Sequence, residues 1–99
     1  MTYGLSKAGV IQLTRATALA LAPEVRVNSV SPGQVVTRWP REKMSAEWAE
    51  ETEARMAAST PLKSNASAEH VAQAVMGFLA MDFVTGQDLI VDGGKSVTY

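Results

Sequence analysis

The stretch VRVNSVSPG, residues 25–33, decides the fold of this sequence. Its three valines are β-branched and predict a short strand over Val25–Val30. Pro32 then fixes φ and lacks an N–H group, and Gly33 permits a close approach of the backbone to another group. The strand therefore ends in a loop that a ligand can approach closely. Taken alone, however, the Pro-Gly pair favours an ordinary strand-to-loop turn.

Helix-forming segments lie before and after this strand. Residues 3–22 are good helix formers with apolar side chains at near-helical intervals, and Pro23 ends the run. Ser67 is a favoured N-cap for another helix over about residues 68–80. His70 falls in the first turn of that helix, where a capping or exposed histidine is more common than a catalytic one. The side chains expected on its apolar face are Val71, Val75, Phe78 and Leu79.

A second strand is predicted over Gln87–Val91. The turn residues Thr85-Gly86 precede it, and Asp92-Gly93-Gly94 ends it. A helix lies between the two predicted strands, and strands joined by a helical crossover pair in parallel. The pattern therefore predicts an α/β fold, although two strands are too few for a stable sheet on their own.

The segment of residues 38–62 is charged and amphipathic. Ser45 is suited to the N-cap of a helix and Glu47 to its first turn. A single stripe is expected from side chains that follow one another at four-residue steps, namely Met44, Trp48, Thr52 and Met56. One interpretation is a surface helix whose stripe packs on the rest of the chain.

Tyr3 and Lys7 stand four residues apart in the first predicted helix. At that spacing two side chains are neighbours, with Cβ atoms roughly 5–6 Å apart. A positive charge at about that distance, at an effective dielectric of about 20, favours a phenolate by roughly 3 kcal/mol, which brings the pKa of a tyrosine down toward neutrality. The helix N-terminus acts in the same direction. The pair is a candidate for proton transfer, and the alternative is an ordinary surface contact.

The composition argues against several classes of function. The 99 residues carry nine basic and ten acidic side chains, for a net charge of −1, with no basic cluster suited to nucleic acid. Cysteine is absent and His70 is the only histidine, so we expect no metal site. No apolar run approaches the roughly 20 residues of a membrane helix, and no signal peptide is visible. We therefore expect a cytoplasmic chain that contacts neither nucleic acid nor membrane.

Three stretches resemble, in their order and spacing, the C-terminal half of a short-chain dehydrogenase/reductase: YGLSKAG at residues 3–9, RVNSVSPGQVVT at 26–37 and VTGQDLIVDGG at 84–94. The resemblance covers nearly the whole chain. It implies the C-terminal part of a Rossmann-type, doubly wound parallel sheet, with two strands and three to four helices. Residues 1–99 would then be the C-terminal portion of a single NAD(P)-binding domain whose N-terminal half is absent. Its parts would be the catalytic helix at 3–22, the substrate lid at 38–62, and the last helix and strand at 68–91.

The resemblance also implies roles for individual residues. Tyr3 would be the general acid/base, and Lys7 would lower its pKa and hold the nicotinamide ribose. The residues that would contact the cofactor are Tyr3, Lys7, Pro32, Gly33, Val35 and Thr37. The residues that would line the substrate lid are Trp39, Trp48 and Met56. No metal ligand is implied.

The implied function is hydride transfer between NAD or NADP and a small-molecule alcohol or carbonyl substrate, in a protein that is a homo-oligomer when full length. None of the seven glycines forms the glycine-rich turn that holds a dinucleotide pyrophosphate between a strand and a helix. We therefore expect the 99 residues alone to be inactive. Two alternatives stay open: a non-catalytic remnant that acts as an interaction module, and an independent helical binding protein in which Tyr3 and Lys7 have no joint role.

Overall fold

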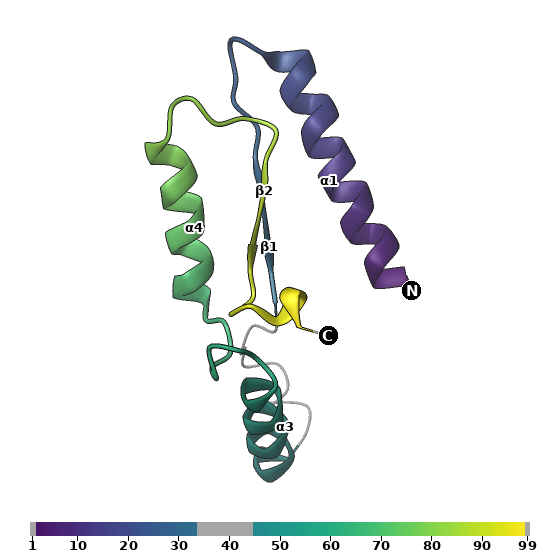
Figure 1. Ribbon diagram of the computed structural model, residues 1–99, viewed down its shortest axis with the longest axis vertical. Helices are drawn as coiled ribbons and strands as arrows, with labels where there is room; N and C mark the ends of the chain where they lie inside the picture. The colour runs from purple at the N-terminus through teal and green to yellow at the C-terminus, as the bar shows by residue number, and fades with distance from the viewer. Residues whose placement is uncertain (1, 34–44, 99) are drawn as a thin grey trace. The chain divides into compact units, whose positions relative to one another are not determined.

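The computed structural model describes residues 2–33 and 45–98, with the backbone alone for residues 2–6. The elements in these ranges are, in chain order, α1 (Thr2–Leu21), β1 (Ser29–Pro32), α3 (Ala46–Ala58), α4 (Ala68–Ala80), β2 (Asp88–Val91) and the short 3₁₀ helix η1 (Lys95–Val97) (Figure 1). No described helix combines the length and the apolar character that crossing a bilayer requires.

The chain divides into two compact units. Unit 1 consists of Met1–Ser31 and Gln73–Ile90, and it contains α1 and the larger part of α4. Unit 2 consists of Pro32–Ala72 and Val91–Tyr99, and it contains α3, the beginning of α4, and η1. The boundary crosses both strands close to their C-terminal ends, so each unit contains part of the sheet.

β1 and β2 form a two-stranded parallel sheet. The Ser29 N–H donates to the Gln87 carbonyl at 2.9 Å. Four residues later, the Gly33 N–H donates to the Val91 carbonyl at 3.0 Å. Donor and acceptor advance together along the two strands, which is the pattern of a parallel ladder. The expected α/β fold with a parallel pair of strands is therefore confirmed.

The first strand begins later than the predicted Val25–Val30, at Ser29. The residues before Ser29 lie beside residues 84–87, as the hydrogen bond from the Gly86 N–H to the Val27 carbonyl at 2.7 Å shows. The Val27 N–H, however, donates to the Thr85 hydroxyl at 3.0 Å rather than to a carbonyl. The predicted bounds are wrong because valine content records β propensity but not which backbone groups find a partner strand.

The Asn28 side chain joins the two segments that lead into the strands. Its Nδ2 donates to the Val84 carbonyl at 3.0 Å, and its Oδ1 accepts the Gln87 N–H at 3.0 Å. Because the Gln87 N–H is bonded to this side chain, the ladder of β2 begins at Asp88. The strand predicted over Gln87–Val91 is one residue shorter for that reason.

α1 and α4 lie on opposite sides of the parallel strands in unit 1 (Figure 1). In α1 the positions 7, 11, 14 and 18 share one face, and Thr14 and Ala18 on that face are 8% and 3% exposed. Ala18 packs on the segment before β2, since a Cβ added to Gly86 would lie 3.5 Å from the Cβ of Ala18. The helix predicted over residues 3–22 is thus present and packs on the sheet through one face.

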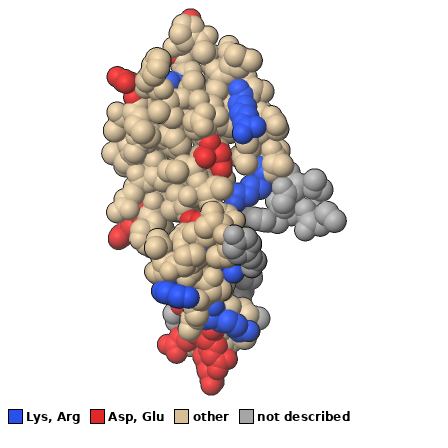
Figure 2. All heavy atoms as spheres, viewed as in Figure 1, with Lys and Arg blue, Asp and Glu red and all other residues tan. Residues whose placement is uncertain are grey.

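The described residues bury few apolar side chains completely. The buried apolar residues are Ala18, Ala49 and Ala74, and no large side chain is fully buried among the described positions. Leu13 of α1 and Leu79 of α4 are 67% and 65% exposed. Figure 2 shows unit 1 as mostly uncharged on the face in view. Exposed apolar surface of this kind is typical of a contact surface.

Side chains cap the helices at the residues that the sequence indicates. Ser45 Oγ accepts the Trp48 N–H at 3.1 Å at the start of α3. Ser67 Oγ accepts the His70 N–H at 3.2 Å, and His70 Nδ1 accepts the Ser67 N–H at 3.0 Å. This reciprocal pair is a capping box in which histidine takes the place of glutamate. α4 spans the predicted residues 68–80, and His70 has the capping position expected of it.

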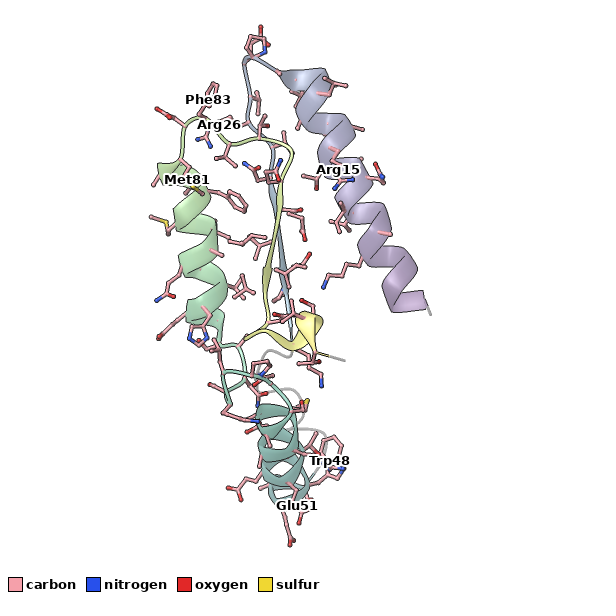
Figure 3. All side chains as sticks on the ribbon, viewed as in Figure 1. Arg15, Arg26, Trp48, Glu51, Met81 and Phe83 are labelled. Atoms are coloured by element: carbon pink, nitrogen blue, oxygen red, sulfur yellow. The ribbon has the colours of Figure 1, made fainter. Side chains whose placement is uncertain are left out.

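Arg26 caps the other end of α4. Its guanidinium donates to the Phe78 carbonyl at 3.0 Å and also to the Met81 carbonyl. Figure 3 shows Arg26 and Met81 close together at this end of the helix. The Phe78 carbonyl also accepts the Met81 N–H at 3.3 Å, so Arg26 gives it a second donor and supplies one to the Met81 carbonyl, directly after the helix ends at Ala80.

We expect Asn28→Ala to lower the free energy of unfolding by about 1–3 kcal/mol, because it leaves the Val84 carbonyl and the Gln87 N–H without a partner. Asn28→Asp keeps the acceptor and loses the donor, so it should lower the free energy of unfolding by less than Asn28→Ala does. Urea unfolding followed by circular dichroism measures both changes.

Gln87→Ala is the matched control for this experiment. The Gln87 side chain is exposed and makes a 3.5 Å contact with the Thr85 carbonyl, while its backbone N–H is retained in the variant. The free energy of unfolding should therefore change by less than about 0.5 kcal/mol. Equal losses from the two alanine variants would contradict the bridging role of Asn28.

Candidate functional site

Tyr3 and Lys7 both lie in α1, one helical turn apart. The backbone therefore has the arrangement that the sequence predicts for this pair. Lys7 is half-buried and shares the sheet-facing side of α1 with Thr14 and Ala18. The side chain of Tyr3 lies outside the described atoms. The roles of the two residues in proton transfer stay predictions.

Pro32 and Gly33 lie where β1 ends. The Gly33 N–H donates to the Val91 carbonyl, so the chain is still paired with its neighbour at this point. A Cβ added to Gly33 would lie 2.8 Å from the Cβ of Asp92 and 3.1 Å from its Cα. The two backbones meet more closely than a residue with a side chain allows. The close packing against Asp92 therefore requires glycine at position 33. The contact of Gly33 with a cofactor stays a prediction.

Asp92 fixes the turn against which Gly33 packs. Its Oδ1 accepts the Gly94 N–H at 3.0 Å, and its Oδ2 accepts the Ser96 N–H at 2.8 Å. Gly93 and Gly94 have φ values of 65° and 92°, in the left-handed region that favours glycine. The Asp-Gly-Gly sequence, predicted only to end the strand, thus forms a hydrogen-bonded turn beside the end of β1.

A carboxylate links the two strands on the face of the sheet turned away from α4. Asp88 Oδ1 accepts hydrogen bonds from the hydroxyls of Ser29 and Ser31, each at 2.7 Å. Ser31 is 7% exposed and Asp88 is half-buried. Hydrogen bonds to an ionised acceptor are about twice as strong as those between neutral groups. This cluster therefore ties β1 to β2 directly before the Pro32–Gly33 loop.

Sequence reasoning misses the Asp88 cluster. Part of the cluster can be predicted from the sequence, because side chains alternate along a strand and this alternation places residues 29 and 31 on one face. A parallel register that sets Ser29 beside Gln87 then brings Asp88 between the two serines. Without that register, three polar residues in two strands look like ordinary exposed positions.

α3 supplies the described part of the predicted lid. Trp48 is 42% exposed and projects from the helix (Figure 3), whereas Ala49 beside it is 1% exposed. Met56 is half-buried. Trp48 thus lies at the margin of the helix face that contains the buried Ala49, and Met56 lies nearer to the centre of that face. The predicted site residues Val35, Thr37 and Trp39 lie outside the described residues.

The described site residues differ in the hydrogen-bond donors that they offer. Lys7 carries an ammonium group, which donates hydrogen bonds to hydroxyl oxygens. Pro32 has no N–H, and the Gly33 N–H is bonded to Val91, so neither residue offers a backbone donor to a phosphate. Within the described ranges, no three acidic or histidine side chains gather as they would around a metal ion.

Comparison with known proteins relates nearly the whole chain to one family. The family whose sequence pattern matches, over residues 1–96, is described as Enoyl-(Acyl carrier protein) reductase. The short-chain dehydrogenase/reductase homolog YusR of Bacillus subtilis (strain 168) is 37% identical over 99 residues, which cover 98% of this chain and 70% of that protein.

Two solved structures share the arrangement of helices and strands. The ligand-free aldohexose dehydrogenase of Thermoplasma acidophilum matches with a TM-score of 0.86 and 33% identity, over 98% of this chain and 41% of that one. A small-chain dehydrogenase in complex with NADPH matches with a TM-score of 0.82 and 28% identity, over 92% of this chain and 41% of that one. The chain thus spans less than half of each of these two proteins.

We expect Gly33→Ala and Gly77→Ala to change stability in opposite directions. The first forces the chain away from Asp92 and should lower the free energy of unfolding by about 1–3 kcal/mol. The second adds a methyl group within α4, where no atom lies within 4 Å, and should raise it by about 0.5–1 kcal/mol. Urea unfolding of both variants is the measurement. A stabilising Gly33→Ala would rule out the tight contact between the two backbones.

Proposed function

The chain belongs to the short-chain dehydrogenase/reductase family, and from this membership we propose that it supplies the proton-transferring part of a NAD(P)-dependent oxidoreductase domain. The proposed reaction interconverts a small-molecule alcohol and the corresponding carbonyl compound. The observation that carries the proposal is the placement of Tyr3 and Lys7 one turn apart in α1, with Lys7 on the side that packs on the sheet.

The task of this chain in the reaction is to move a proton. A bound nicotinamide would supply the hydride to the substrate carbon, or accept it in the reverse direction. Tyr3 donates its phenolic proton to the carbonyl oxygen during reduction and takes it back from the alcohol during oxidation. The Lys7 ammonium stabilises the phenolate left on Tyr3 by Coulomb attraction, because the helix keeps the two residues neighbours.

The same residues would orient the cofactor. Lys7 donates hydrogen bonds to the hydroxyls of the nicotinamide ribose, and Tyr3 lies next to it along the helix. The NADPH bound in one of the similar structures supports NAD or NADP as the cofactor. The end of β1 and the residues after it would face the nicotinamide through Pro32, Gly33, Val35 and Thr37. The lid over the substrate would be lined by Trp39, Trp48 and Met56.

The full-length protein is proposed to be a cytoplasmic homo-oligomer. The lack of cysteine is compatible with a reducing compartment. The exposed apolar side chains of α1 and α4 would be covered in a larger assembly.

A second candidate function is a non-catalytic interaction module. The observation that favours it is the exposure of Leu13 and Leu79, which lie on two different helices of unit 1. Such a module would keep its partner when Tyr3 and Lys7 are both replaced by alanine, and it would show no turnover in a complete domain.

In a complete domain, Tyr3→Phe should lower kcat by at least about a hundredfold, because the phenol supplies the proton. Cofactor binding should be unchanged, since it is spread over many contacts. Lys7→Ala should lower both kcat and cofactor affinity, and Arg15→Ala, which removes an exposed cation of the same helix, should change neither. Steady-state kinetics and calorimetric titration with NADH and NADPH measure these effects. A fully active Tyr3→Phe variant would remove Tyr3 from the mechanism.

The 99 residues alone should neither bind NAD(P) tightly nor reduce a carbonyl. The chain has the proton donor but no glycine-rich turn for the pyrophosphate. Losing even about 5 kcal/mol of binding free energy weakens affinity by several thousandfold. Titration with NADH and NADPH, followed by fluorescence, tests this expectation. Micromolar binding by a monodisperse monomer would show instead that these residues form a self-sufficient site.

A further inference from the structure

The turn at residues 92–96 contacts the chain on both sides of α3. Before α3 in the sequence, Gly33 meets the turn, because a Cβ added to Gly33 would lie 2.8 Å from the Cβ of Asp92. After α3, the Leu62 N–H donates to the Gly93 carbonyl at 3.1 Å. All of these residues belong to unit 2. One turn therefore holds the chain both before and after the helix.

The contact after α3 is close as well as hydrogen-bonded. A Cβ added to Gly94 would lie 3.0 Å from the Cγ of Pro61 and 3.1 Å from its Cβ. Lys95 Nζ donates to the carbonyl of Ser59, the C-cap of α3, at 3.5 Å. The turn therefore packs on the chain directly after the helix.

This connection after α3 folds back on the helix. The buried Thr60 hydroxyl donates to the Ala57 carbonyl at 2.9 Å and accepts the Ser64 N–H at 3.1 Å. Asn65 Nδ2 donates at 2.8 Å to the carbonyl of Glu53, in the middle of α3. The connection is thus fixed both to the last turn of the helix and to its middle. Whatever holds the connection in place also holds α3.

Asp92 determines the shape of the turn. Its carboxylate oxygens accept the N–H groups of Gly94 and Ser96. Glycine has many accessible conformations, so the positive φ values of Gly93 and Gly94 need this support to persist. Removing the carboxylate should therefore loosen the contacts of the turn with the chain before and after α3.

We propose that Asp92 is a positioning residue for substrate binding: through its turn it holds α3, with Trp48 and Met56, at a fixed place relative to Gly33. The proposal rests on the proposed function, because it concerns the lid of the same site. Bringing the two ends of residues 34–60 together costs conformational entropy, and the contacts of the turn offset that cost before a substrate binds. Such preorganisation strengthens binding without taking part in proton transfer.

The first test measures amide hydrogen exchange by NMR in the 99-residue chain. Asp92→Ala should speed exchange by at least about tenfold at Gly33 and Leu62, whose N–H groups are bonded beside the turn. Exchange at Ala22, whose N–H donates to the Ala18 carbonyl in unit 1, should stay unchanged. Asp92→Asn keeps an acceptor for the Gly94 N–H and should lie closer to the parent.

A matched pair of glycine variants locates the contact with the chain after α3. Gly93 and Gly94 have φ values of 65° and 92°, so alanine is strained at both positions. The nearest atom to an added Cβ is 3.6 Å away at Gly93, an ordinary contact, but 3.0 Å away at Gly94, on Pro61. Exchange at Leu62 should therefore be at least about fivefold faster in Gly94→Ala than in Gly93→Ala.

The second test separates positioning from chemistry in a complete domain. The probes are primary, secondary and cyclic alcohols, glucose and cyclohexanol among them, with NAD or NADP. For the alcohol that reacts fastest, Asp92→Ala should raise KM by at least about fivefold and change kcat by less than about twofold, because Tyr3 and Lys7 on α1 are untouched. Asp92→Asn should restore most of the loss in KM.

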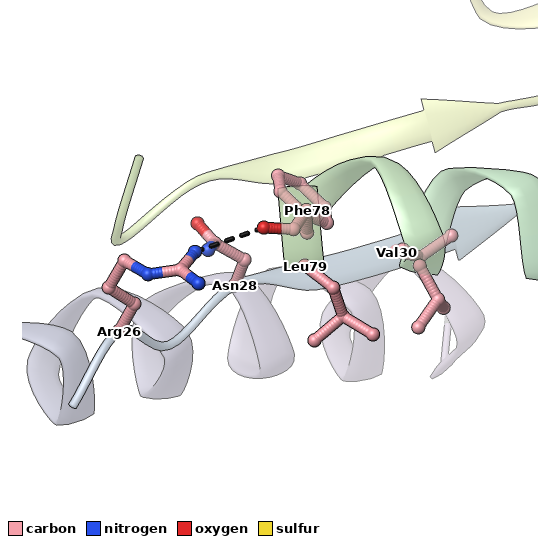
Figure 4. A pocket seen from close by; sticks show the side chains of 6 residues that line it. Arg26, Asn28, Val30, Phe78 and Leu79 are labelled. Carbon is pink, nitrogen blue, oxygen red and sulfur yellow. Dashed lines mark hydrogen bonds between the residues drawn. The ribbon is translucent and has the colours of Figure 1, made fainter. Parts of the chain in front are cut away.

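Arg26→Ala is the control for a general loss of stability. The variant loses the hydrogen bond from Arg26 to the Phe78 carbonyl (Figure 4), which caps α4 and contacts neither the turn nor α3. Its KM should equal that of the parent.

Several results would overturn the proposal. They are unchanged exchange at Gly33 and Leu62 in Asp92→Ala, equal acceleration at Ala22, equal exchange at Leu62 in the two glycine variants, a fall in kcat with KM unchanged, or an equal rise in KM in Arg26→Ala. The exchange measurements involve no cofactor or substrate. A parent domain that turned over none of the alcohols would therefore contradict the proposed function, and the exchange data would still decide whether Asp92 holds both sides of α3.

Discussion

The parallel pairing of β1 with β2 is the constraint on which the rest of the described structure depends. Two hydrogen bonds, from Ser29 to Gln87 and from Gly33 to Val91, fix its register. Parallel strands cannot be joined by a tight turn, so the chain must leave the sheet and return to the same end of it. α4 makes that return, while α1 leads into β1 on the other side of the sheet (Figure 1).

Hydrogen bonds from polar side chains also connect β1 with β2. Asn28 joins the segments that precede the strands, and Asp88 joins the strands through the hydroxyls of Ser29 and Ser31. A large apolar core is lacking among the described residues, whose buried apolar side chains are alanines. Hydrogen bonds depend on direction and apolar contacts do not, so these polar bonds fix one register where apolar packing alone would tolerate others.

The two parts of the candidate site depend on different kinds of geometry. Tyr3 and Lys7 are neighbours through helical periodicity alone, so their relation needs only α1. Gly33, in contrast, packs against Asp92, which is distant in the sequence. The Asp92 carboxylate stabilises the turn at residues 92–96 by accepting hydrogen bonds from two backbone N–H groups. Substitutions at Tyr3 or Lys7 should thus leave the described fold in place, whereas a side chain at Gly33 acts first on the fold.

The sequence by itself determined the class of the fold, the helix at residues 68–80, the first helix to within one residue at each end, the Ser45 and Ser67 caps, and the placement of Tyr3 and Lys7 one turn apart in that first helix. These features are local: propensity, capping and the 3.6-residue period act over a few neighbouring residues. Only the tertiary structure decided that β1 begins at Ser29, that Asp88 binds two serines, and that Gly33 must be small. Each of those depends on contacts between residues about sixty apart in the chain. The strand register that brings these residues together cannot be deduced from the sequence of either segment alone.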